Sequence, residues 1–399
     1  MNLTTNTSMI GALVLTAGTT FAGEPTSLSM DVENALHAEV TADASNHASF
    51  ATNTNEYAPR VFGFIQTRYN ANFSDGYTFS SEDTTTGFEL SRTRIGVRGG
   101  IHPRVSYKIE GDFRSSTGAF RLLDAYTDIE LNDSWDLRIG QFAAPYTRER
   151  QVSSRRQLAS ERSTTHRYFD GSRTQGVGLR YSSDKVRGFL TFNEGFGNTN
   201  TAFNAAAEAD YAITGRLEYL GAGAWDAFRD FTSWRGSSNA WLVGGGVHWQ
   251  DGGETGATGG TTADMEIFAA TADLSMEFDG SNLFAGFYFQ SMDSAAGDFD
   301  DMGAAIQAGM FVTDIVEVFG RWDAVFADSS RPANDDFHTL TAGVNYYLIE
   351  NSHAAKLTFE IAYNLDEQAS SPVPANTTAG VLGSTDEQFN LRAQLSVLF

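Results

Sequence analysis

From residue 61 to its end, this chain repeatedly alternates apolar and polar residues. Segment 356–365 has one apolar face, which carries Leu357, Phe359, Ile361, Tyr363 and Leu365. Segment 123–131 follows the same pattern, with an expected apolar face of Leu123, Ala125, Ile129 and Leu131. A period of two is typical of a β-strand, because successive side chains of a strand point to opposite faces of the sheet. We therefore expect a chain built from long strands.

The length of these segments separates two kinds of β protein. They extend to about 10–12 residues, whereas strands of soluble proteins average about 5–6 residues. One face of each segment is apolar, and the other carries charges in segment after segment. This distribution fits a closed barrel with lipid outside and water inside, since every backbone polar group in a bilayer must be paired. We predict an all-β fold, a transmembrane antiparallel β-barrel over residues 61–399.

The number of segments gives the expected size of the barrel. About 16 strands are predicted, the size at which a barrel holds an aqueous channel. They cover roughly 61–73, 88–100, 103–114, 120–132, 134–142, 173–182, 185–194, 209–220, 240–250, 263–276, 282–292, 303–313, 315–326, 337–349, 354–365 and 388–399. Long links such as 143–172 alternate with short ones such as 183–184, as the outer loops and periplasmic turns of outer-membrane barrels do.

One of the links that this alternation predicts to be short is long. Residues 221–239 are too long for a tight turn, and they contain Trp225, Phe228, Phe231 and Trp234. The sequence leaves two interpretations open for this link. It forms either an ordered periplasmic or interfacial element, or a segment that simply packs in the core.

Both ends of the chain carry export and assembly features. Residues 1–22 hold a short apolar core followed by Thr20-Phe21-Ala22, which is typical of a signal peptide and its cleavage site. The apolar run at 10–14 is far too short to span a bilayer as a helix. Residues 23–60 are expected to form a polar periplasmic leader or a short helix. The final Phe399 falls on the lipid-facing side of the last strand, where a terminal aromatic residue resembles the assembly signal of outer-membrane proteins.

Charge and composition exclude several classes of function. The net charge is −23, which argues against nucleic acid as a partner. The chain has no cysteine, so it has no disulfide and no thiolate metal site. The charge is also uneven, because residues 1–200 hold 20 basic and 22 acidic residues whereas residues 201–399 hold 7 and 28. Any function assigned to the chain must account for this asymmetry.

The link 143–172 is the most basic part of the chain. Residues 143–173 contain seven arginines against three carboxylates, and these arginines are Arg148, Arg150, Arg155, Arg156, Arg162, Arg167 and Arg173. The polar faces of the two segments 88–100 and 103–114 add Arg92, Arg94, Arg98, Lys108 and Arg114. We interpret these twelve residues as a candidate pore or anion-binding surface.

Two interpretations of this basic set follow from its chemistry. Guanidinium groups stay charged and bind phosphate or carboxylate through paired hydrogen bonds, and basic rings in pores favour anions. In a wet pore each contact contributes about 1 kcal/mol, so millimolar binding, near −4 kcal/mol, needs several arginines together. The alternative is a scaffold in which arginines pair across the lumen with Glu110, Asp112, Asp124, Asp128 and Glu130.

Residues 138–179 combine several short motifs. Gly140-Gln141-Phe142 precedes Pro145, Glu161-Arg162-Ser163 follows, and Arg173 stands ahead of Gly176. Together they resemble the phosphate-selective porin O and P family. The resemblance implies a trimeric outer-membrane porin of about 16 strands whose third loop folds inward and narrows the pore.

The same resemblance sets the expected function. Ala143 stands where the family often has lysine, and the chain has only three lysines, so we predict a channel for small anions or other small solutes, with phosphate one candidate. The expected partners are these solutes, outer-membrane lipid and further copies of the chain in a homotrimer. No cofactor is expected.

Three alternatives remain at the level of the sequence. The first is a non-selective general porin, and the second is a surface adhesin or soluble β-sandwich. The third is a barrel enzyme, which would need a serine and a histidine together on the lipid face. The seven histidines are scattered, and His248 falls on the polar side of its segment, so we expect it in the lumen and expect no enzyme.

Overall fold

The computed structural model describes residues 59–74, 84–113, 117–202, 209–252, 265–294, 297–383 and 387–399. The predicted signal peptide 1–22, nearly all of the predicted leader 23–60 and the candidate residue Arg114 lie outside these residues. Within the described part of the chain, no helix is long and apolar enough to cross a membrane.

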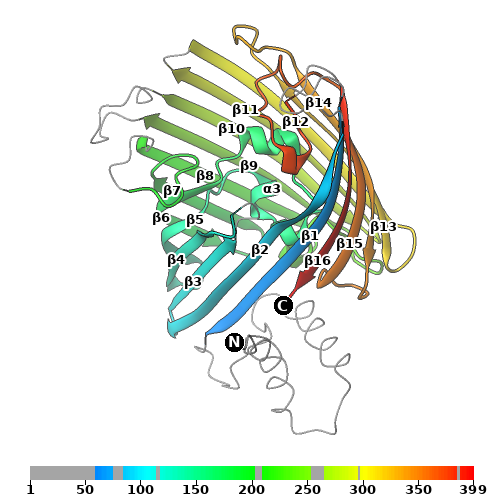
Figure 1. Cartoon of the computed structure of the whole chain (residues 1–399). Helices are drawn as coiled ribbons and strands as arrows, with labels where there is room; N and C mark the ends of the chain where they lie inside the picture. Colours follow the sequence, from blue (N-terminus) through cyan, green and yellow to red (C-terminus); the bar gives the residue numbers. More distant parts are fainter. Residues whose placement is uncertain are drawn as a thin grey trace, which may run out of the picture.

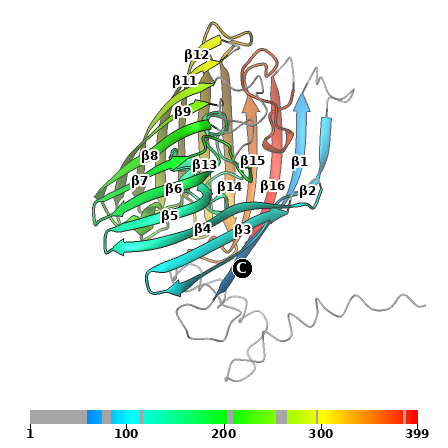
Figure 2. The ribbon, with the colours of Figure 1, turned by 90° about the vertical axis from the view of Figure 1, so that its left-hand side faces the viewer.

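Sixteen strands of the described residues close into one antiparallel barrel, which confirms the predicted fold (Figures 1 and 2). They are β1 (Arg60–Ser74), β2 (Thr84–His102), β3 (Val105–Phe113), β4 (Phe120–Asn132), β5 (Trp135–Ala143), β6 (Arg173–Ser182), β7 (Val186–Asn193), β8 (Ala209–Ala222), β9 (Ala240–Gly252), β10 (Glu266–Phe278), β11 (Ser281–Ser294), β12 (Gly297–Phe311), β13 (Val316–Phe326), β14 (Phe337–Tyr347), β15 (Ala355–Asn364) and β16 (Gln388–Leu398). Each strand pairs with its neighbours in the chain, and β1 pairs with β16 to close the ring. Closure leaves no open sheet edge to face lipid.

The two faces of the strands differ as the alternation predicts. In β15, Phe359 and Ile361 are exposed on the outside, whereas Thr358 and Glu360 are buried toward the lumen. The outer face is therefore the apolar surface that lipid requires, and the inner face carries the polar groups.

The last residue takes part in closing the barrel. The backbone N–H of Phe399 donates to the Gly63 carbonyl over 3.0 Å, and the Gly63 N–H donates back to Phe399 over 2.8 Å. A Cβ atom at Gly63 would lie 2.5 Å from the Arg94 carbonyl oxygen and 2.7 Å from the Phe399 ring. Glycine at position 63 therefore lets the terminal aromatic ring lie directly on β1.

The expected position of Leu123 is wrong. The register of β3 and β4 shifts between Glu110 and Gly111, which pair with Asp124 and Leu122 respectively. Leu123 is the extra residue of this irregularity, and it is buried rather than exposed to lipid. A β-bulge changes the face on which the following residues lie, so strict alternation fails at this point.

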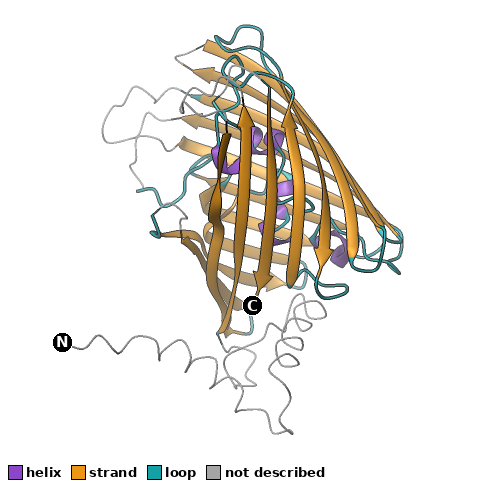
Figure 3. Cartoon of the chain, turned by 45° about the vertical axis from the view of Figure 1, so that its right-hand side comes forward, coloured by secondary structure: helices purple, strands orange, loops and turns teal. Residues whose placement is uncertain are grey.

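Three connections fold into the barrel, where the short helices lie (Figure 3). Loop 3 (residues 144–172) contains α3 (Arg148–Gln151), η1 (Ser154–Arg156) and α4 (Thr164–Phe169). Loop 8 (residues 365–387) contains η3 (Thr377–Ala379). The third connection, which we call the long turn (residues 223–239), begins with η2 (Trp225–Arg229) and joins β8 to β9.

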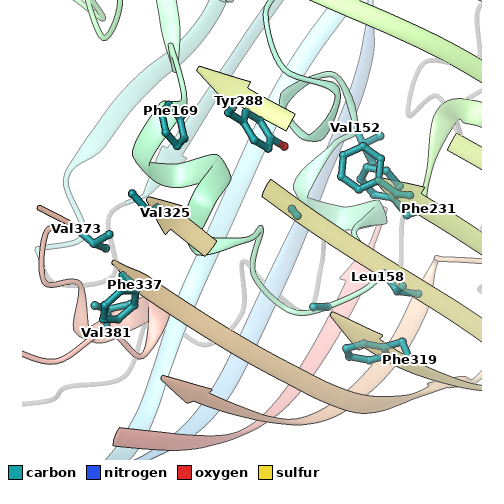
Figure 4. Packing of buried hydrophobic residues seen from close by; sticks show 13 residues of the cluster. Val152, Leu158, Phe169, Phe231, Tyr288, Phe319, Val325, Phe337, Val373 and Val381 are labelled. Carbon is teal, nitrogen blue, oxygen red and sulfur yellow. The ribbon is translucent and has the colours of Figure 1, made fainter. Parts of the chain in front are cut away.

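An apolar cluster inside the barrel was not expected from the sequence. It joins loop 3, the long turn and loop 8 to inward-facing residues of β11 to β14 (Figure 4). Its buried members are Val152, Leu158, Ala159, Phe169, Phe231, Phe284, Tyr288, Ala305, Phe319, Val325, Phe337, Val373 and Val381. The inner face is therefore apolar where the inward-folded connections meet these strands, and the expectation of a uniformly polar inner face is wrong there.

Candidate functional site

Loop 3 begins its helices with ordinary capping residues. The Thr147 hydroxyl accepts from the Arg150 backbone N–H at the start of α3, and the Ser163 hydroxyl accepts from the His166 N–H at the start of α4. Side-chain caps of this kind satisfy backbone donors that a helix terminus leaves without a partner. The basic side chains of the loop are therefore carried on short, fixed turns.

One buried carboxylate joins the first part of loop 3, around α3, to the part just before α4. Glu149 is 1% exposed, and it accepts from the Ser163 backbone N–H over 3.0 Å and from the Ser163 hydroxyl over 2.7 Å. Arg162 joins the same two parts of the loop, because its side chain donates to the carbonyl oxygens of Glu149 and Val152 over 2.7 Å each. Arg162 therefore serves the internal structure of the loop.

A second set of contacts fixes loop 3 to the wall across the lumen. Both oxygens of Glu161 are used, one by Arg68 of β1 and the other by Arg92 of β2, at 2.6 Å each. The hydroxyl of Ser160 donates to Glu360 of β15 over 2.5 Å. Charged hydrogen bonds of this length are the strong class, so the loop is held firmly in the lumen.

The wall formed by β2 to β6 carries a ladder of ion pairs. Asp124 and Asp128 each accept from two basic side chains, and Asp112 accepts from Arg94. The pairs are Arg94–Asp112 at 3.1 Å, Lys108–Asp124 and Arg173–Asp124 at 2.7 Å, Arg138–Asp128 at 2.7 Å and Arg180–Asp128 at 3.0 Å. These contacts are the scaffold that the sequence offered as an alternative to an anion site.

Between this wall and loop 3 lies a cavity of about 210 Å³, which we call the basic cavity. Strands β1 to β4 and loop 3 contribute its lining, which is Phe62, Arg98, Lys108, Glu110, Tyr126, Ser153 and Arg155. Three of these side chains are basic and one is acidic. The cavity thus gathers an excess of positive charge, supplied by two strands and by loop 3, inside a protein that is strongly acidic overall.

The remaining candidate arginines lie around loop 3. Arg150 forms two hydrogen bonds with Asp170, of which the Nε–Oδ1 bond is 2.9 Å long. Burial, followed by the neighbouring Arg162, Arg173 and Arg94, lowers the pKa of Arg150 well below its usual range.

Two other candidates lie away from the basic cavity. Arg148 is buried and donates to the Phe228 carbonyl oxygen of the long turn. Arg167 is carried by α4, and its Nη1 atom has no hydrogen-bond partner within the described residues. Arg156 follows Arg155 in η1, next to the part of the loop that lines the cavity.

Several arginines that organise the lumen were missed at the level of the sequence. Arg68 holds loop 3, Arg138 lies 3.6 Å from the centre of the Tyr126 ring, and Arg216 pairs with Asp273 at 2.8 Å. Each of these arginines falls on the polar side of its predicted strand, so the sequence pattern could have shown that it points inward. The sequence pattern could not show which residue it pairs with, because the partners lie on other strands or on loop 3.

A pH prediction follows from the buried His166 in α4. Its Nδ1 lies 3.0 Å from the Thr147 hydroxyl, and burial, together with Arg150, Arg162, Arg167 and Arg321, lowers its pKa well below 6.5. His166 therefore stays neutral in the folded protein, and unfolding returns its pKa to the ordinary value of a histidine. Stability from this residue is complete above pH 6.5 and falls as the pH drops below that value, by about 1.4 kcal/mol per pH unit.

Urea unfolding in detergent between pH 8 and pH 5 measures this effect. We expect His166→Gln to flatten the loss of stability below pH 6.5, whereas His102→Gln, at the exposed last residue of β2, should leave it unchanged. The same slope in wild type and His166→Gln would contradict the prediction.

Comparison with known proteins places this geometry in context. The family model described as phosphate-selective porin O and P matches residues 65–384, well over half of the chain. A search of curated proteins finds no match.

Solved structures share the fold at low sequence identity. The anion-selective porin from Comamonas acidovorans is 15% identical with a TM-score of 0.59, covering 86% of this chain and 99% of its own. OmpT of Vibrio cholerae is 14% identical with a TM-score of 0.57, covering 87% and 99%. The outer membrane channel DcaP of Acinetobacter baumannii is 13% identical with a TM-score of 0.55, covering 88% and 100%.

Proposed function

Because the chain belongs to the phosphate-selective porin O and P family, we propose that it conducts small anions by passive diffusion and that phosphate is one of several such solutes. The protein is a bacterial outer-membrane porin, a channel and not an enzyme. One observation supports the proposed preference of the channel for anions. The lining of the basic cavity carries three basic side chains, Arg98, Lys108 and Arg155, and one carboxylate, Glu110. Lys108 pairs with Glu110 at 2.6 Å and with Asp124 at 2.7 Å, so the positive excess of the lining comes from Arg98 and Arg155.

The chemistry of this cavity suits transit better than tight binding. Each basic group contributes about 1 kcal/mol to an anion at ~4 Å in water and about 4 kcal/mol at an effective dielectric of 20. The net positive charge of the lining attracts an anion into the pore, and the carboxylates beside Lys108 and the wet surroundings keep the attraction small enough for release. Arg94, Arg150 and Arg173 lie between the cavity, β6 and loop 3, but each is paired with a carboxylate (Asp112, Asp170 and Asp124 respectively), so they belong to the scaffold of this wall.

The experiment is a reversal-potential measurement on the purified porin in a planar bilayer. In a tenfold KCl gradient we expect a potential of the sign that chloride permeation gives, and we expect added phosphate to reduce the chloride current as the two anions compete. A potential of the opposite sign would refute the anion preference. A potential near zero would favour the alternative, a non-selective general porin.

Two further proposals concern assembly. Export to the outer membrane supports a signal peptide at residues 1–22 and a periplasmic leader at 23–60, ahead of the barrel at 61–399. A homotrimer is supported by the trimeric form solved for OmpT of Vibrio cholerae. Mass determination of the detergent-extracted protein, corrected for bound detergent, tests the trimer, and N-terminal sequencing of the mature protein tests the cleavage site.

A further inference from the structure

The long turn between β8 and β9 is folded into the end of the barrel. Phe228 and Phe231 are each 4% exposed, and Thr232 and Ser233 are also buried. Residues 223–239 therefore form an ordered element with its own buried side chains in place of a short hairpin turn.

Contacts across the barrel fix the long turn in place. Asp230 lies 3.1 Å from the His353 ring nitrogen in the turn before β15, and the Thr232 hydroxyl lies 3.1 Å from the Tyr347 hydroxyl of β14. The Trp234 ring packs against Tyr347 and Phe311, with ring centres 4.8 and 5.3 Å apart. The element therefore reaches from β8 and β9 to β12, β14 and the turn before β15.

Inside the lumen the long turn meets loop 3. The Arg148 side chain of loop 3 donates to the Phe228 carbonyl oxygen, and its guanidinium lies 5.4 Å from the centre of the Phe231 ring. Phe231 also packs on Phe284 of β11, with ring centres 5.0 Å apart, and shares the apolar cluster with Val152 (Figure 4). The two inward-folded connections thus form one continuous body against the β11–β14 side.

We propose that the long turn is a second constriction element, which closes the periplasmic end of the barrel along β8 to β15 and confines solutes to the side of β1 to β6. The basic cavity lies on that side, lined by β1, β2, β3, β4 and loop 3. This inference rests on the proposed function for the identity of the solute. The narrowing of the pore concerns only its open cross-section, and single-channel conductance measures that cross-section separately from the identity of the solute.

The first test shortens the long turn. Residues 224–239 are replaced by Asn-Asp-Ser, the sequence of the chain's own tight link at 132–134. We expect the single-channel conductance in 1 M KCl to rise roughly twofold, because conductance follows the open cross-section of the pore, and chloride selectivity to fall toward that of bulk solution. A folded variant, shown by its heat-dependent mobility on a gel, with unchanged conductance would overturn the inference.

Point variants keep the inference testable if the shortened chain does not fold. Phe231→Ala with Trp234→Ala removes two anchoring rings and should raise conductance and its fluctuations in the same direction, whereas the matched control Asp226→Ala, a 73% exposed residue of the same turn, should not. Unchanged conductance in the double variant would count against the constriction. A larger conductance in a porin that shows no anion preference would support the constriction and refute only the proposed solute class.

Discussion

Replacing Glu161 by glutamine should lower the free energy of unfolding by roughly 3–5 kcal/mol, because it removes a carboxylate shared by the buried Arg68 and the partly buried Arg92. Arg68 and Arg92 each lie 2.6 Å from the Glu161 carboxylate, and the Arg68 side chain is fully buried. Without the negative charge, the two guanidinium groups face each other across a neutral amide. Loop 3 should therefore detach from β1 and β2, and the single-channel conductance should rise.

Urea unfolding in detergent and single-channel recording check this prediction. Asp226→Asn is the matched control, since Asp226 forms a 2.6 Å ion pair with Arg229 but is 73% exposed, and exposed pairs contribute about 0–1 kcal/mol. Burial raises the pKa of Glu161, but Arg92 and Arg68 outweigh it and lower the pKa below its usual range. The stabilisation should thus be present above pH 4.5 and be lost as the pH falls toward the lowered pKa, and a variant as stable as the control would contradict it.

Neutralising the basic cavity should have the largest effect on ion selectivity. The triple variant Arg98→Gln, Lys108→Gln, Arg155→Gln removes three positive charges and leaves Glu110 in place. A change of about 1 kcal/mol for each charge, partly screened by salt, should lower the chloride-to-potassium permeability ratio by roughly tenfold or more. Reversal potentials of wild type and variant in the same KCl gradient measure this ratio.

A matched variant separates the cavity from charge in general. Arg235→Gln removes a cation from the long turn, where Arg235 forms an exposed pair with Asp314 at 3.3 Å. This variant should leave the permeability ratio close to that of wild type. If the triple variant behaved like Arg235→Gln, the basic cavity would not be the selective part of the path.

Loop 3 shows how far local patterns determine the candidate site. The concentration of arginines at residues 143–173 is visible in the sequence, and the family resemblance implied that this loop folds inward. The roles of the individual arginines are not visible, because Arg150 pairs with Asp170 and Arg162 closes the loop on itself, whereas Arg155 reaches the basic cavity. Arginines only a few residues apart thus make different contacts, and the position of loop 3 inside the barrel determines which contact each one makes.

The sequence alone determined the barrel, its sixteen strands and the direction of most strand side chains, because a period of two is a local property of each segment. Only the tertiary structure decided the contents of the lumen. The apolar cluster, the place of the long turn and the anchors of loop 3 depend on residues far apart in the chain, such as Ser160 and Glu360, separated by 200 positions. Contacts of that kind arise from closure of the barrel, which brings β1, β15 and loop 3 together and which no local pattern encodes.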